Sequence, residues 1–501
     1  MKRALFSACD ARGIVEFAMP LTAWGWSIIA TGETVKALAE AGVKSEDSRD
    51  FVQEHRDYPF PPTLHPKMES ALTQDVPYRI DLVYDVPYPP SEGNDVGGRT
   101  LLALAAKGGR IVAYTSEDMR LVVDGLRADK AHESIPSKLR QELIDKANAH
   151  VAGHYMNLAR RGEYDGLIGK SVLKLASGEN PYQVPAHLYA VDGVDDLALS
   201  RFKSLTNSVP CYTNLADTDS VLHAMCLAAE AFRLNRNGVP YIAAAAKHGN
   251  PCGMVVDWNS PANAVEKALW GNPMAVWGGE FMANFRITGE LAEGLYEDKR
   301  RGERGGSKWM LDVVAAPEFE DEAVEVLGRR PVSKLLTNPA LNEPKLPEDE
   351  LGIRHVRGGF LRQPLQNYVL DLRERKLDNG VVDSLIIAWC VAYSSFHGGN
   401  EVSLAKDRHL IGVGGGPSTV EAAQTAVSRA RNIGHGTEGS VFCADAFFPF
   451  TDAPKLLCEA GCRCGAVPCG GRREAEVRDY FKGAGVEVIY LPADCRGFIR
   501  H

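Results

Sequence analysis

Two adjacent side chains, Lys247 and His248, stand between an apolar stretch and a Gly-Asn-Pro-Cys-Gly turn in the segment AAAAKHGNPCG. A histidine titrates near neutral pH and can take a proton from an attacking amine. A neighbouring ammonium lowers the protonated fraction of that histidine and stabilises negative charge that develops on an oxygen. A strand that ends in a tight turn directs such side chains into a crevice. The dipeptide alone does not separate this chemistry from two incidental loop residues.

A second segment, DAFFPFTD at residues 445–452, places three phenylalanines and a proline between two aspartates. Aromatic faces stack on flat rings, and a carboxylate at their edge accepts hydrogen bonds from ring nitrogens. The segment is therefore compatible with a site for a pteridine ring. A hydrophobic staple at a domain interface would use the same residues, so both interpretations stay open.

Three consecutive glycines, Gly414–Gly416, follow the apolar stretch HLIGV and precede a predicted helix. Glycine turns let backbone amides approach a ligand. The spacing differs from that of a dinucleotide fingerprint or of a phosphate-binding loop. A tight connection between a strand and a helix explains the glycines equally well.

The cysteine pattern argues against a transition metal. Structural zinc sites favour repeated C-x2-C pairs. The late cluster Cys458, Cys462, Cys464 and Cys469 lacks that spacing, so small buried residues are the favoured interpretation. A zinc deaminase needs H-x-E followed by P-C-x-x-C. Pro251-Cys252 is followed by Val255 where the second cysteine would stand, so no metal site is predicted.

Length and composition bound the class of protein. With 501 residues the chain is too long for one ordinary core, so we expect two or more domains. The net charge is −9 without a block of basic residues, which argues against nucleic acid or an anionic membrane as the main partner. The 11 cysteines are dispersed as in a reduced protein. The chain has no membrane-length apolar run or secretory signal, so the cytoplasm is the expected location.

Apolar and amphipathic segments alternate in the first part of the chain. We predict strands at residues 3–8, 26–32, 80–90 and 110–116, and helices at 13–25, 33–43 and 97–109. This alternation indicates an α/β fold with a parallel sheet and helices on both faces. Ligands of such sheets bind beyond the carboxyl ends of the strands.

The segment 133–165 has helical character, and we place a domain boundary close after it, near residue 165. The remaining residues, 166–501, exceed one ordinary core, so two similar lobes are expected. Each lobe contains an apolar strand followed by a helix. The two examples are YIAAAAKHGNPCG with SPANAVEKALWG, and HLIGVGGGPS with TVEAAQTAVSRA.

In order along the chain, these segments resemble the bifunctional AICAR transformylase/IMP cyclohydrolase family of purine biosynthesis. The resemblance covers nearly the whole chain and is strongest in its C-terminal two-thirds. The matching segments are GENPYQ (178–183), NLADTDSVLHA (214–224), KHGNPCG (247–253), VWGGEFMANFRIT (276–288), RGGFLRQ (357–363), AWCVAYSSFHGGNEVSLAKD (388–407), IGVGGGPS (411–418), DAFFPFTD (445–452) and the terminal RGFIRH.

The resemblance implies a function for residues 166–501. They are similar to a transformylase domain of two cytidine-deaminase-like lobes without zinc. In that family the amino group of an aminoimidazole carboxamide ribotide, AICAR, attacks the formyl carbon of 10-formyltetrahydrofolate. His248 matches the general base and Lys247 the neighbouring residue that stabilises charge or relays the proton. Asn400 matches the amide that binds the formyl oxygen.

The same resemblance assigns the binding residues and an assembly. Asn180, Asn214, Arg496 and Phe498 match positions on the ribotide side, and Pro449, Phe450 and Asp452 match the folate side. A homodimer is implied because the family builds this site across two subunits. A monovalent cation is left open as a further requirement.

One departure concerns the phosphate of the substrate. The family reads Leu-Arg-Tyr-Gly where this chain has Leu175-Ala176-Ser177-Gly178, so an arginine that holds phosphate is replaced by Ala176. Lys170, Lys174 or Arg201 can supply a relocated cation. The alternative is a relative that acts on a modified or unphosphorylated aminoimidazole carboxamide.

Residues 1–165 resemble the cyclohydrolase domain, whose fold is similar to methylglyoxal synthase. Tyr88, Asp95 and Lys107 match catalytic positions, and TLHPK (63–67) is retained. Three departures weaken the match. Pro62 replaces a lysine, and Glu33 replaces a glycine. Cys9–Gly13 stands where the family has a phosphate-binding loop, and Arg12 can take the place of the lysine of that loop.

A glutamate beside a bound phosphate is repelled by it. Two interpretations of the first domain stay open: it closes the purine ring to IMP, or it has lost this activity and serves as a scaffold or sensor. A binding protein without catalysis is a further alternative for the whole chain.

Overall fold

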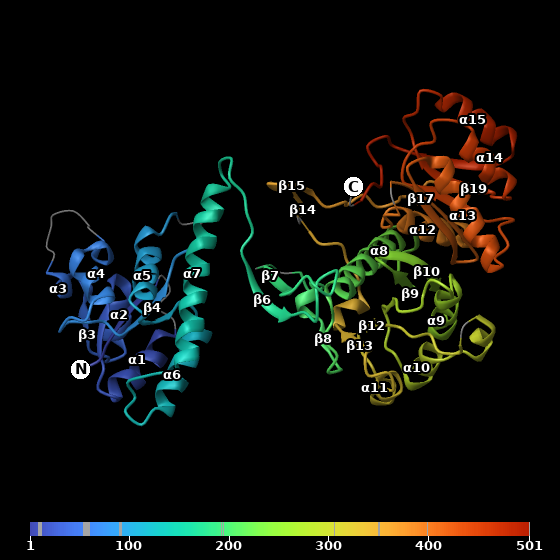
Figure 1. The fold of residues 1–501 in the computed structure, drawn as a ribbon. Coiled ribbons are helices and arrows are strands. Elements are labelled where there is room, and N and C mark those ends of the chain that lie inside the picture. The colour runs from blue at the N-terminus through green and yellow to red at the C-terminus, as the bar shows by residue number, and fades with distance from the viewer. Residues whose placement is uncertain are drawn as a thin grey trace. The chain divides into compact units, whose positions relative to one another are not determined.

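The computed structural model describes residues 1–8, 13–53, 61–89, 93–191, 193, 195–304, 306–348, 351–397 and 399–499. The chain divides into an N-terminal unit, Met1–Gly169, and a C-terminal unit, Lys170–His501 (Figure 1). Both contain sheets covered by helices, so the α/β prediction is confirmed. No helix within the described residues is long and apolar enough to span a membrane.

The N-terminal unit is built on a parallel sheet of five strands in the order β3-β2-β1-β4-β5. The strands are β1 (Arg3–Ala8), β2 (Ser27–Ala30), β3 (Ser45–Asp47), β4 (Leu82–Val86) and β5 (Ile111–Ala113). The helices are α1 (Ile14–Ala23), α2 (Gly32–Glu40), α3 (Ser48–Val52), η1 (Pro62–Leu64), α4 (Pro66–Thr73), α5 (Val96–Lys107), α6 (Ser116–Ala128) and α7 (Ser137–Ala159). The alternation predicted from the sequence is thus confirmed, with α7 beginning directly after Pro136.

The C-terminal unit is built on a mixed sheet of eleven strands, in the order β20-β19-β18-β16-β17-β10-β9-β11-β12-β13-β8. Its first half contains α8 (Tyr212–Arg236), β9 (Tyr241–Lys247), β10 (Asn250–Asp257), α9 (Pro261–Trp270), β11 (Glu280–Ala283), α10 (Gly289–Tyr296), η4 (Lys299–Arg304), β12 (Val313–Ala316), α11 (Asp321–Gly328) and β13 (Lys334–Thr337). Its second half contains α12 (Asn379–Ala392), β16 (Asn400–Lys406), β17 (His409–Gly416), α13 (Thr419–Ile433), β18 (Val441–Ala444), α14 (Asp452–Glu459), β19 (Cys464–Pro468), α15 (Glu474–Gly483) and β20 (Glu487–Leu491).

Two hairpins and short segments complete this unit. They are β6 (Gly169–Lys174), β7 (His187–Val191), η3 (Leu199–Arg201), β8 (Lys203–Ser204), η5 (Pro339–Asn342), β14 (Leu351–Val356) and β15 (Gly359–Pro364). β6 pairs with β7, and β14 with β15, outside the large sheet.

The two halves of the large sheet repeat one order of elements, and we call them the first lobe (α8 to β13) and the second lobe (α12 to β20). In each lobe a helix precedes an antiparallel hairpin, and three further strands follow with helices between them. Alternate residues of β9 contact the two faces: Ala244 packs with α8 and α12, whereas Ala245 packs with α9 and α10. The two lobes meet where β10 pairs with β17.

The glycines Gly414–Gly416 lie within β17 and not in a turn that opens a helix. A Cβ on Gly414 would lie 2.4 Å from the carbonyl oxygen of Ala422 in α13, and one on Gly415 would lie 2.4 Å from Glu401 Oε1. The interpretation as an amide cradle is therefore corrected. These glycines allow close packing of the strand against a helix and a buried carboxylate.

Candidate functional site

One edge of the large sheet gathers several residues whose types could carry chemistry, including the predicted Lys247 and Asn400. β9, β17 and β18 run in one direction and end at this edge, while β10, β11 and β16 begin there. The edge therefore holds Lys247 at the end of β9, Glu280 at the start of β11, Asn400 at the start of β16 and Asp445 after β18. Antiparallel pairing alone brings these distant segments together.

Lys247 and His248 occupy the end of β9 and the first position of its hairpin turn. Lys247 pairs with Asn250, so His248 and Gly249 form the whole turn, with φ angles of 52° and 68°. Positive φ at both positions is the geometry of a type I′ turn, which matches the twist of the flanking strands. His248 is exposed, whereas the half-buried Lys247 ammonium donates a hydrogen bond to the carbonyl of Gly278.

Two carboxyl groups that the sequence analysis did not single out lie beside this turn: Glu280, which is buried, and Asp217, which is half-buried. Glu280 is 2% exposed, and the amide of Asn214 donates to its Oε1 over 3.4 Å. Burial and then the charge of Asp217 raise the pKa of Glu280 to about 9. Burial also raises the pKa of Asp217, against the charges of His248 and Lys247. Both acids lie in segments already quoted, NLADTDSVLHA and VWGGEFMANFRIT, which was the available signal.

The turn forms part of a pocket of about 260 Å³ between the two lobes. β10 pairs with β17 at Val255 and His409, toward the edge opposite His248. Residues of both lobes line the pocket. They include Lys247, His248, Asn250, Asn272, His397, Val413 and Arg429. The structure thus combines the predicted Lys247-His248 pair with a histidine of the second lobe.

The second lobe contributes the start of β16 to the same edge. Asn400 donates through its side-chain amide to the carbonyl of Gly416 over 3.2 Å. Beside it, the 1%-exposed Glu401 accepts from the backbone amide of His397, and its Oε2 lies 2.9 Å from His397 Nδ1. Burial and then the charge of Glu401 raise the pKa of Asp445 to about 8. His397 and Glu401 had no assigned role in the sequence analysis.

The segment 445–452 departs in part from the predicted aromatic wall. Phe448 is 2% exposed and packs in the core with Phe442 and Phe481, because β18 leads it under the helices of the second lobe. Phe450 is 50% exposed, and Asp452, also exposed, begins α14. The prediction of a wall of three phenylalanines is therefore wrong. Phe450, beside the half-buried Pro449, is the accessible part of this segment.

The C-terminal segment lies near this loop. The guanidinium of Arg496 lies 4.8 Å from the ring centre of Phe447, in cation–π geometry. Gly497 donates to the carbonyl of Asp445 over 2.8 Å, which fixes the chain between Arg496 and Phe498. Phe498 is 39% exposed. The predicted residues Arg496 and Phe498 thus follow β20 at the same edge of the sheet.

The segment around Ala176 adjoins the start of α8. Ala176 donates through its backbone amide to Pro210, and Tyr212 donates to the carbonyl of Ser177. Asn180 is exposed, and its amide donates to Gln183 Oε1 over 2.8 Å. Asn214 is buried in the first turn of α8. Of the proposed substitute cations, Arg201 is paired with Asp196, whereas Lys170 lies on β6.

The N-terminal unit has its own cluster beyond the end of β4. The buried carboxyl of Asp85 and that of Asp95, which caps α5, face the same glycine: a Cβ on Gly98 would lie 2.7 and 2.6 Å from their Oδ2 atoms. Burial raises the pKa of Asp85 to about 7. Asp85 Oδ2 has no hydrogen-bond partner among the residues that the structure describes. Arg99 is buried beside them, 3.4 Å from His154.

The three predicted cyclohydrolase residues do not all meet. Tyr88 donates to the carbonyl of Asn94 over 3.4 Å, which places it next to Asp95. Lys107 is the last residue of α5, whereas Asp95 precedes its first, so about 18 Å of helix axis separate them. Glu33 pairs with Lys36 at the surface. Cys9–Arg12 lie outside the described residues, so the predicted role of Arg12 stays a prediction.

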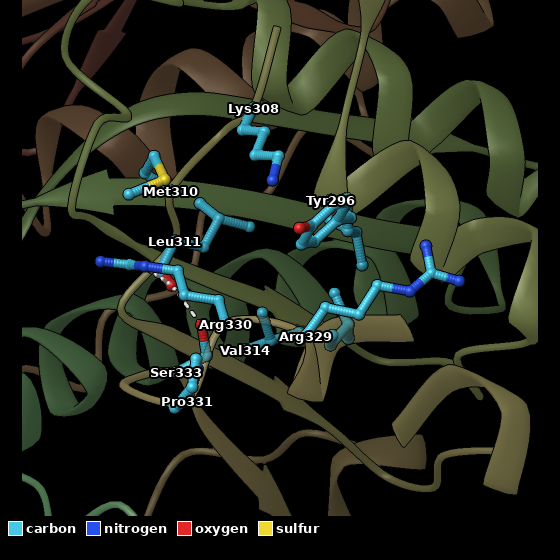
Figure 2. Close-up of a pocket in the computed structure, with 11 residues that line it drawn as sticks. Tyr296, Lys308, Met310, Leu311, Val314, Arg329, Arg330, Pro331 and Ser333 are labelled. Atoms are coloured by element: carbon cyan, nitrogen blue, oxygen red, sulfur yellow. Dashed lines mark hydrogen bonds between the residues drawn. The ribbon is translucent and has the colours of Figure 1, made fainter. Parts of the chain in front are cut away.

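A further pocket of about 200 Å³ lies at the ends of α10 and α11 (Figure 2). Its cations already have partners. Lys308 lies over the ring of Tyr296, Arg329 pairs with Glu293, and Arg330 with Asp312. No group of metal-binding side chains occurs within the described part of the chain. The cluster from Cys458 to Cys469 is unbridged, and burial raises the pKa of its thiols.

Comparison with known proteins gives a consistent result. Residues 110–429 match the family described as AICARFT/IMPCHase bienzyme. The chain is 29% identical to the bifunctional purine biosynthesis protein PurH of Bradyrhizobium diazoefficiens, over 97% of each chain. It is 28% identical to PurH of Polynucleobacter necessarius, over 98% of each. A solved structure titled Crystal structure of ForH matches 31% of this chain and 94% of its own at 25% identity, with a TM-score of 0.25.

Proposed function

The chain belongs to the AICARFT/IMPCHase bienzyme family, and on this premise we propose that its C-terminal unit transfers a formyl group from 10-formyltetrahydrofolate to the 5-amino group of AICAR. Membership makes it an enzyme of purine biosynthesis with formyltransferase activity. The observation that carries the assignment to this unit is the meeting of Lys247, His248 and Asn400 at one edge of the large sheet.

The chemistry follows from these three residues. The amine attacks the formyl carbon, a new C–N bond forms, and the bond from that carbon to the folate nitrogen breaks as this nitrogen gains a proton to give tetrahydrofolate. His248 takes the proton that the amine loses, because an aromatic amine is a poor nucleophile without a base. Lys247 and the amide of Asn400 stabilise the oxygen that becomes negative. Asn400 uses one amide hydrogen on Gly416 and keeps the second for that oxygen.

Binding residues are assigned to the same edge. Asn180, Asn214, Arg496 and Phe498 hold the ribotide, while Pro449, Phe450 and Asp452 hold the folate. The exposed ring of Phe450 and the cation of Arg496 support these roles. The unit, assigned to residues 166–501, has two cytidine-deaminase-like lobes and acts as a homodimer. A monovalent cation, but no transition metal, accompanies the folate cosubstrate.

For residues 1–165, a methylglyoxal-synthase-like domain, we propose two competing interpretations: it closes the formylated product to IMP, or it has lost this activity. The buried carboxyls of Asp85 and Asp95, next to Tyr88, support proton transfer there. The place of Lys107 at the far end of α5 favours the competing interpretation, in which this domain has lost the activity.

The transferase assignment is tested by mixing the full chain with AICAR and 10-formyltetrahydrofolate and following tetrahydrofolate release. We expect turnover by the wild type and a kcat lower by about 10²- to 10⁴-fold in His248→Asn. Ring closure is tested separately by giving formyl-AICAR to the His248→Asn chain and measuring IMP absorbance. A rate equal to that in buffer would remove the cyclohydrolase assignment and leave the transferase untouched.

Ala176 favours a second candidate substrate, an unphosphorylated or modified aminoimidazole carboxamide. Comparing the kcat/KM values for the ribotide and for its riboside decides between them. If another cation replaces the family arginine at Ala176, kcat/KM should be much higher for the ribotide than for the riboside. Equal values for the two compounds would favour the second candidate.

A further inference from the structure

A second histidine faces the pocket that holds Lys247 and His248. His397 lies in the segment between α12 and β16, and its side chain is 15% exposed. Its Nδ1 is 2.9 Å from Glu401 Oε2, so Nε2 is the ring nitrogen left for a ligand. A carboxylate bound to one imidazole nitrogen fixes the ring and supports its protonated form.

The position of the Glu401 carboxylate is fixed from several sides. Glu401 is 1% exposed, and its backbone amide donates to Asp445 Oδ1 over 2.9 Å. The carboxylate fits only because residue 415 is glycine, since a Cβ there would lie 2.4 Å from Glu401 Oε1. A carboxylate buried this completely needs a donor or a cation, and His397 supplies both the backbone and the ring contact.

Asn250 joins the segment of His397 to the turn of the first lobe. Its Oδ1 accepts from the backbone amide of Phe396 over 2.9 Å, and its Nδ2 donates to the carbonyl of His248 over 3.1 Å. Gly249 leaves no room for a side chain, because a Cβ would lie 2.7 Å from the ring of Phe396. One side chain thus holds the two histidine-bearing segments against each other.

We propose that His397, positioned by Glu401, is a second proton-transfer residue, which donates a proton to the folate nitrogen as its bond to the formyl carbon breaks. The inference rests on the formyl transfer proposed above. One proton passes from the amine to His248 and one from His397 to the leaving nitrogen. The products are the formamide and tetrahydrofolate, and both histidines recover by exchanging a proton with water. His248 accepts one proton and His397 donates the other. With a single base, the same group would have to accept the first proton and then donate it.

The charges around His397 suit a proton donor. Glu401 on β16 faces it directly, and Asp445 lies behind Glu401. Lys247 and His248 from the first lobe and Arg429 from α13 also line the pocket. In Glu401→Gln the ring of His397 loses the carboxylate that faces it, while Lys247 and Arg429 remain in the lining of the pocket.

The experiment measures formyl transfer by the full chain over about pH 6 to 9 for wild type, His397→Ala, Glu401→Gln and the exposed control His355→Ala. We expect His397→Ala to lower kcat by about 10²-fold. Its KM values should stay within about threefold, because substrate binding is intact. Added imidazole should restore part of the rate. Glu401→Gln should keep the fold and move the alkaline fall of kcat to lower pH. His355→Ala should match the wild type.

Several outcomes would overturn the inference. A His397→Ala enzyme with wild-type kcat, or one with raised KM alone, removes the proton-transfer role. His397→Ala could be inactive and not rescued by imidazole, while the alkaline fall of kcat in Glu401→Gln stays at the wild-type pH. These two results together would assign His397 and Glu401 a structural role instead. If the wild type itself transfers no formyl group, the proposed function and this inference fall together.

Discussion

The two lobes of the C-terminal unit share one order of elements but present opposite ends to the pocket. In the first lobe the turn after β9, His248-Gly249, lies at the pocket edge. In the second lobe the equivalent turn, Asp407-Arg408, has the same positive φ angles but lies at the opposite edge. The reason is that β10 and β17 pair in antiparallel fashion, which turns the second hairpin over.

The difference separates what the fold needs from what the chemistry needs. A lysine ends the first strand of both hairpins: Lys247 faces the pocket, whereas Lys406 donates to Glu438 at the other edge. Glu280 pairs with Ala246 just before Lys247, and Val441 occupies the equivalent place beside Ala405. Since valine serves there, the fold does not require an acid, and we infer that Glu280 is present for the site.

The largest contrast is expected between His248→Asn and Asp407→Asn. Asparagine tolerates the left-handed backbone of both turns, so both variants keep the hairpin. His248→Asn removes the proposed base and should lower kcat for formyl transfer by about 10²- to 10⁴-fold. Asp407→Asn should leave kcat unchanged. Equal losses in the two variants would mean that the turns matter for folding and not for chemistry.

A smaller contrast is expected between Lys247→Met and Lys406→Met. Methionine keeps most of the length of the side chain but removes the charge that stabilises the oxyanion, so Lys247→Met should lower kcat by about 10- to 10³-fold. Lys406→Met lies at the opposite edge and should retain full activity. The measurement is steady-state tetrahydrofolate release, and circular dichroism serves as the folding control. Full activity of Lys247→Met would remove its catalytic role.

The third pair compares stability. Gly253 and Gly412 occupy equivalent places on β10 and β17, against the helices α9 and α13. A Cβ on Gly253 would lie 1.8 Å from the carbonyl of Ala268, and one on Gly412 would lie 2.4 Å from that of Ala426. Both alanine variants should lose about 1–3 kcal/mol in urea unfolding, with the larger loss for Gly253→Ala. A larger loss for Gly412→Ala would show that the first lobe relaxes around the added methyl group more easily than the second.

The fourth contrast is a pH dependence carried by Glu280. Its pKa is raised to about 9 from 4.5, so between these values the folded chain keeps a proton that the unfolded chain has lost. This contribution to stability therefore falls as the pH rises through that window. The stability of Glu280→Gln lacks this dependence on pH. The melting temperature of the variant, relative to that of the wild type, should therefore increase from acidic to alkaline pH. Val441→Ile is the matched control in the second lobe. A difference independent of pH would contradict the raised pKa.

The sequence determined the elements and several of the active side chains. Periodicity predicted β1, β2, β4, β5, α1, α2, α5 and α7 of the N-terminal unit, because apolar residues there follow local repeats. It did not predict β3, α3, α4 or α6. An apolar strand and a glycine turn flank Lys247 and His248 in the chain itself, which made the pair a candidate, and the ordered matches to the family gave it a role. An apolar strand followed by a helix also recurs in both lobes and could be recognised in the sequence. These are local properties, which neighbouring residues decide.

Only the tertiary structure decided which residues meet. Glu280, Asp217 and His397 are ordinary in sequence. Antiparallel pairing of β11 with β9 and of β16 with β17 brings Glu280 and the segment of His397 to one edge, where Asp217 of α8 lies beside Glu280. Phe448 looked like part of a binding wall, but β18 leads it into the core. The glycines of β17 looked like a turn, whereas close packing against α13 and Glu401 explains them. Burial and proximity arise from contacts between distant segments, and no local pattern encodes these contacts.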